Sequence, residues 1–107
     1  MLVRMQTSSG GEVTLNPTVI KAGSIGTSSS SKTMTQEIDL TKTYLVFIST
    51  NYTNTPNYQI VWLVDKGQKS ILHQGDITQN ITISGTTLSI TNSSSTYSRS
   101  YCLTQLD

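Results

Sequence analysis

Cysteine and histidine are nearly missing from this chain of 107 residues, which has one of each. The single cysteine, Cys102, excludes an internal disulfide and is typical of a protein that folds in a reducing compartment. Zinc sites combine several cysteine and histidine ligands, so we expect no metal site and no cofactor. We expect Cys102 to serve as a small hydrophobic residue of the core.

The scarcity of histidine also bears on catalysis, because a nucleophilic triad would have to include His73. Asp76 follows closely, but the chain has no Gly-x-Ser-x-Gly elbow, and we interpret His73 as a strand-end histidine beside a turn. Glu37 and Asp39 would share one face of a strand, where two acids could serve glycoside hydrolysis or hold a hard cation. A solvated strand face is the favoured interpretation, and we predict that the chain is not an enzyme.

Charged residues make up only 12% of the chain, and its formal net charge is +1. Its basic residues are scattered singly, whereas nucleic-acid binding draws affinity from clustered lysine and arginine, so we expect no nucleic-acid partner. No apolar run approaches the roughly 20 residues of a spanning helix, so we expect no membrane association. The first residues lack the apolar region of a secretory signal, and we expect no export by that route.

The chain is instead rich in hydroxyl side chains, with 16 serines and 18 threonines. Serine and threonine are weak helix formers, while threonine, valine, isoleucine and tyrosine suit pleated strands. Short apolar alternations predict an all-β fold, an antiparallel, jelly-roll-like β-sandwich of about eight strands. We expect one domain over residues 1–107, with residues 1–11 as a flexible arm. The predicted strands are 12–15, 18–22, 33–40, 44–50, 58–65, 70–74, 77–84, 86–92 and 97–106.

Two hairpins have turn residues that explain them. In Asp65–Gln68, Gly67 can take the positive φ of a three-residue or bulged loop. In Ile83–Thr86, a two-residue turn would fold residues 77–83 onto 86–91. That second hairpin should place one set of side chains on the packed face, namely Ile81, Ile83, Leu88 and Ile90.

Two runs, Tyr44–Ile48 and Ile60–Val64, are apolar on both faces and carry no charge. Such strands invite aggregation at a sheet edge, so we expect them to be central. Another sheet, a loop or a neighbouring subunit could cover their second face, and we favour the subunit. Trp62 could stack on a sugar, but its apolar run favours a place in the core.

Three loops connect the predicted strands, at residues 23–32, 51–57 and 92–96. Tyrosine among asparagine, serine and threonine resembles the composition of adaptable recognition surfaces. For each loop alone, a plain solvated turn is the simpler interpretation. The candidate receptor-contact residues are Tyr52, Tyr58 and Tyr97.

Four segments carry a resemblance to a known group of proteins: Lys42–Ser49, Ile60–Trp62, Ile81–Asn92 and Tyr101–Leu106. They resemble the C-terminal β-domains of bacteriophage tail-fibre, head-fibre and baseplate-associated proteins, over about the last two-thirds of the chain. The resemblance implies a virion component, often a homotrimer, that is made in the bacterial cytoplasm and released by lysis. It supplies no catalytic or binding residues, and the chain departs from the group in lacking an obvious stalk repeat.

The sequence therefore favours a non-enzymatic structural or appendage protein of a phage virion. We expect it to form a homo-oligomer, with a trimer favoured, and to attach to a glycan or protein receptor on the bacterial surface. The alternative is a monomeric carbohydrate-binding or adhesin-like module.

Overall fold

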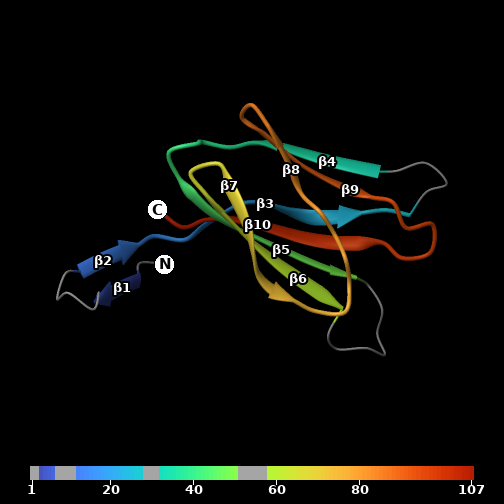
Figure 1. The fold of residues 1–107 in the computed structure, drawn as a ribbon, viewed down its shortest axis with the longest axis horizontal. Helices are drawn as coiled ribbons and strands as arrows, with labels where there is room; N and C mark the ends of the chain where they lie inside the picture. The colour runs from blue at the N-terminus through green and yellow to red at the C-terminus, as the bar shows by residue number, and fades with distance from the viewer. Residues whose placement is uncertain (1–2, 7–11, 28–31, 51–57) are drawn as a thin grey trace.

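The protein is an antiparallel β-sandwich of eight strands in two sheets (Figure 1). Its computed structural model describes residues 3–6, 12–27, 32–50 and 58–107, and every regular element in these ranges is a strand. The larger sheet has the order β3 (Thr18–Ile25), β10 (Arg99–Gln105), β5 (Thr43–Thr50), β6 (Gln59–Asp65), β7 (Gln68–Gln74). The smaller sheet has the order β4 (Lys32–Glu37), β9 (Thr87–Asn92), β8 (Thr82–Ser84). The predicted sandwich is confirmed.

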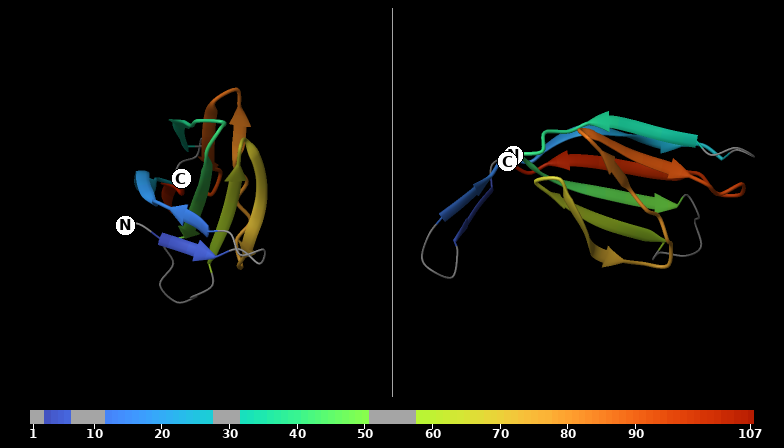
Figure 2. Two further views of the ribbon diagram at one scale, coloured as in Figure 1. Left: turned by 90° about the vertical axis from the view of Figure 1, so that its left-hand side faces the viewer. Right: turned by 45° about the horizontal axis from the view of Figure 1, so that its top comes forward.

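Two further strands, β1 (Val3–Gln6) and β2 (Glu12–Leu15), pair only with each other. This hairpin extends away from the two packed sheets, beside the end where the C-terminus lies (Figure 2). β2 matches the strand predicted at 12–15, whereas no strand is predicted at 3–6, so β1 is an addition to the predicted strands. Within the described residues, the structure has no helix with the length and apolar character needed to cross a bilayer.

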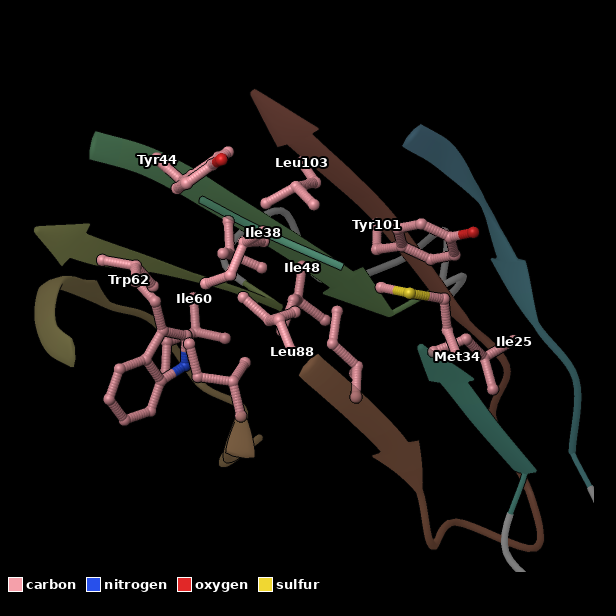
Figure 3. Packing of buried hydrophobic residues seen from close by; sticks show 14 of the residues in the cluster. Ile25, Met34, Ile38, Tyr44, Ile48, Ile60, Trp62, Leu88, Tyr101 and Leu103 are labelled. Carbon is pink, nitrogen blue, oxygen red and sulfur yellow. The ribbon is translucent and has the colours of Figure 1, made fainter. Parts of the chain in front are cut away.

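The core lies between the two sheets because alternate side chains of each strand point to opposite faces. In Figure 3, Met34 of β4 points across the interior toward Tyr101 of β10, and Leu88 of β9 faces Ile48 of β5. Both two-faced strands are internal, as predicted, and Trp62 is a core residue with 8% of its surface exposed. The largest fully buried side chains are Ile48, Ile60, Ile81, Leu88, Ile90, Leu103, Val46, Val64 and Asn92.

The two hairpins form where they were predicted, with different turns. Between β6 and β7, Asp65 pairs with Gln68, and Lys66 and Gly67 have φ of 49° and 84°, which makes a two-residue turn. Between β8 and β9, Ser84 pairs with Thr87, so the two-residue turn is centred one position later than expected. The apolar face of this hairpin is as predicted, because the new register places Ile83 opposite Leu88.

Three predicted boundaries are wrong. The strand predicted to reach Leu40 ends at Glu37, because the Asp39 carboxylate accepts hydrogen bonds from the Thr41 backbone and hydroxyl and turns the chain. The strand predicted at 77–84 begins only at Thr82. The loop predicted at 23–32 starts later, because β3 continues to Ile25 by pairing with β10, and residues 28–31 lie outside the described ranges.

Candidate functional site

An open cleft of about 260 Å³, lined by both polar and apolar groups, lies at one end of the sandwich. Its walls come from the end of β5, the residue that precedes β6, the segment after β7, the segment between β9 and β10, and the start of β10. The chain positions that form it are therefore far apart in sequence and are brought together by strand pairing. The lining residues are Thr50, Tyr58, Asp76, Ile77, Thr78, Tyr97 and Arg99.

Arg99 is the fixed cation of this cleft. Its Nε donates to the side-chain oxygen of Gln79 at 3.2 Å, and its Nη1 donates to the Thr50 hydroxyl. Gln79 is itself 8% exposed, and its Nε2 donates to the carbonyl of Thr91 at 2.9 Å, so the acceptor is anchored from the smaller sheet. Burial lowers the pKa of Arg99, but an arginine stays protonated at any ordinary pH.

Tyr97 is held by a network around Asn92, whose side chain is fully buried. The Asn92 amide nitrogen donates to the carbonyl of Tyr97 at 2.9 Å, and the amide oxygen accepts from the Ser94 backbone at 3.0 Å. The backbone nitrogen of Tyr97 donates in turn to the Ser94 hydroxyl at 3.0 Å. The loop after β9 is thus tied to the core, and Tyr97 is presented at the cleft with 37% of its surface exposed.

Two of the three predicted receptor-contact residues meet at this cleft. Tyr58 is half-buried and packs against the hydrophobic core, while Tyr97 is on the more exposed side. Tyr52 lies outside the described residues. Arg99 was not singled out from the sequence; the only hint was its position two residues after Tyr97.

Trp62 borders a second depression, of about 340 Å³, that shares Thr78 with the first. The indole nitrogen donates to the Gln79 carbonyl at 2.9 Å, and the Lys69 ammonium lies 5.3 Å from the ring centroid. Lys69 also donates to the carbonyl of Ile81 at 2.6 Å. These contacts cover the ring and satisfy its polar atom, which agrees with a structural role for Trp62.

The residues weighed for catalysis or metal binding are dispersed. His73 is exposed near the end of β7, as expected, opposite Val61. The Glu37 carboxylate accepts hydrogen bonds from the hydroxyls of Thr86 and Thr87, which lower its pKa, and it does not share a strand with Asp39. Within the described ranges, no three histidine, cysteine or acidic side chains gather as a metal site would require.

The second notable surface is the outer face of the five-stranded sheet. We define it by the side chains that alternate with the buried ones at its centre: Leu45, Phe47, Val61, Leu63 and Cys102. Strand register places Phe47 between Val61 and Cys102, and Leu45 beside Leu63. Phe47 is 40% exposed, and the others are half-buried. Among the described strands, the three-stranded sheet packs on the opposite face of the five-stranded sheet.

This register overturns one expectation from the sequence. Cys102 was predicted to lie in the core, but its neighbours Tyr101 and Leu103 point inward and are buried. Cys102 therefore points to the outer face, where its sulfur lies 3.6 Å from the Thr104 hydroxyl.

The fold and these two surfaces define an antiparallel β-sandwich with a cleft of mixed polar and apolar lining at one end and an apolar outer face. No protein-family model, curated protein or solved structure matches the chain.

Proposed function

We propose that this protein is a non-enzymatic structural or appendage protein of a phage virion. In this proposal it is made in the bacterial cytoplasm, assembles as a homotrimer and attaches to a receptor on the bacterial surface. The observation that carries the proposal is the apolar outer face, because it gives the chain a surface suited to its own copies.

The composition of the outer face supports association. Exposed apolar side chains that lie side by side mark interaction sites in soluble proteins, and the centres of interfaces are enriched in phenylalanine and poor in charge. Phe47, the most exposed member, lies at the centre of β5, flanked by Val61 on β6 and Cys102 on β10. The charged residue nearest in register, Asp65, lies at the end of β6 and would fall at the rim.

The sequence resemblance supports the virion context. Its four segments fall on β5, on β6, on the β8–β9 hairpin and on β10. Three of these, β5, β6 and β10, also supply the outer face. Three of the four segments that resemble phage appendage domains would thus meet in the trimer.

The mass of the purified protein in solution, measured by light scattering after size exclusion, tests the proposal. We expect a trimer for the wild type and a monomer with unchanged circular dichroism for Phe47→Asp. Thr82→Asp, which places the same charge on an exposed position of β8, is the control and should remain trimeric. A monomeric wild type, or a trimer unaffected by Phe47→Asp, would contradict the proposal.

The cleft favours a second candidate, a monomeric carbohydrate-binding or adhesin-like module. Its two tyrosines and its hydroxyl and carboxylate groups are the chemistry that sugar recognition uses. Glycan binding by a monomer, lost on Tyr97→Ala, would make this the better account.

A further inference from the structure

We infer that the cleft between Tyr58, Tyr97 and Arg99 binds one residue of an acidic saccharide, with its carboxylate on Arg99 and its ring against Tyr97. The inference deepens the proposed receptor attachment and rests on it only for its biological role. The geometry of the cleft is independent of the oligomeric state, since one chain supplies all of its described lining.

The first step is the state of the Arg99 guanidinium. Among the described residues, its side chain donates to the Gln79 amide oxygen and to the Thr50 hydroxyl, and both of these groups are neutral. These two bonds use the Nε–H and one Nη1–H. A partly buried cation with neutral partners gains most from an anion, and the planar guanidinium fork matches a carboxylate in a two-bond arrangement.

The second step is the shape and lining of the cleft. At about 260 Å³ it lies just below the range of roughly 300–1,000 Å³ that holds drug-sized ligands, so it suits a single ring. The aromatic ring of Tyr97 offers an apolar surface to the C–H face of a sugar. The Thr78 hydroxyl and the Asp76 carboxylate, both on exposed residues, offer partners for sugar hydroxyls.

The third step is the order already present in the walls. Thr50 and Gln79 fix the arginine, and the Asn92 network fixes the backbone of Tyr97. A site that is rigid before binding loses less conformational entropy when its ligand arrives. The cleft is therefore built from supported side chains, which distinguishes it from a chance grouping of surface residues.

The test is a titration of the isotope-labelled protein with sodium glucuronate, followed by NMR chemical shifts of the backbone and of the arginine Nε–H. We expect saturable shifts at Thr50, at 76–78 and at 97–99, with a Kd on the order of 1 mM, the strength typical of one small polar ligand. Glucose, which lacks the carboxylate, should bind at least about tenfold more weakly.

Variants then measure separately what the Tyr97 ring and the Arg99 guanidinium contribute to binding. Tyr97→Ala and Arg99→Lys should each weaken glucuronate binding about tenfold or more, because one loses the stacking surface and the other the planar fork. Tyr97→Phe keeps the ring and should bind within about threefold of the wild type. Lys32→Gln removes a positive charge from exposed β4 and is the matched control, with no expected change.

Four results would overturn the inference: no saturable shift, equal binding of glucose and glucuronate, equally tight binding of inorganic phosphate, or a wild-type affinity for Tyr97→Ala. Repeating the titration on Phe47→Asp separates this inference from the proposed function. Retained binding by a monomer supports the site even if the trimer fails, and a trimer that binds no glucuronate leaves the proposed assembly intact.

Discussion

The two outer faces of the sandwich differ sharply although both are made by the same alternation of side chains. On the three-stranded sheet, the hydroxyls of Thr33 and Thr91 share a hydrogen bond of 2.8 Å across β4 and β9, and Glu37 is bound by two further threonines. On the five-stranded sheet, the outward positions at the centre of β5 and β6 hold Phe47 and Val61, which lie opposite each other. One face carries hydrogen-bonded polar side chains, while the other carries apolar side chains at its centre.

The largest expected effect is on the free energy of unfolding, and it distinguishes an inward side chain of β5 from an outward one. Ile48 is fully buried, and Ile48→Ala should lower the free energy of unfolding by about 2–5 kcal/mol through lost burial and a cavity. The adjacent Phe47→Ala removes an outward side chain and should cost the monomer roughly 1 kcal/mol, since part of its surface is already in water. Urea unfolding of both variants at low protein concentration makes the comparison, and equal losses would show that the outer face also holds the single chain together.

A smaller effect is expected on the polar sheet, in the turn that joins β8 to β9. Gly85 has a φ of +60°, and a Cβ there would meet nothing within 4 Å, so Gly85→Ala introduces backbone strain alone. We expect a loss of about 1–2 kcal/mol in the free energy of unfolding. Gly26→Ala also enters open space but has no positive φ, so a thermal unfolding midpoint near that of the wild type is its expected result.

The smallest effect concerns the charge on the polar face. Hydrogen bonds from Thr86 and Thr87 lower the pKa of Glu37 below its ordinary value of 4.5. The pKa of Glu37 is lower in the folded protein than in the unfolded chain. Its contribution to stability is therefore fully present at pH values above the unfolded pKa, and it is lost as the pH falls through the folded pKa. Bonds from Thr41 lower the pKa of Asp39 and act with the same sign.

The urea concentration at the unfolding midpoint of the wild type should therefore decrease as the pH is lowered from 6 to 3. The decrease should be smaller for Glu37→Gln. Gln has no carboxyl to titrate, so an identical pH dependence in the two proteins would exclude Glu37 as a contributor. No such difference is expected on the apolar outer face, which carries no titrating carboxyl at its centre.

Much of the fold could be predicted from the sequence because turns and strands are determined largely by residues close together in the chain. The hairpin at Gly85 and the internal positions of β5 and β6 follow from alternation and from apolar runs that cannot lie at an edge. The errors arise where a side chain overrides the pattern. Asp39 ends a strand that alternation alone would continue, and pairing with β10 extends β3 into a segment whose composition indicates a loop.

The candidate site was less accessible from the sequence. Tyr58 and Tyr97 could be chosen by composition, but their meeting depends on β10 lying beside β5, which no local signal fixes. Arg99 gains its setting from Thr50 and Gln79, residues far away in the chain. The outward position of Cys102 depended on strand register, which shifts every side chain to the other face when it moves by one residue.

The place of β10 within the larger sheet also governs the order in which the protein can assemble. β10 lies between β3 and β5, so two strands made much earlier share a neighbour that is made after both. On the ribosome, β3 and β5 keep open hydrogen-bonding edges until residues 99–105 have emerged. Pairings of this long range make folding slow, and open edges in the meantime can pair with other chains. A nascent chain halted before Arg99 would lack an internal strand of its sheet and not merely an edge strand, so β3 would have no partner in that sheet.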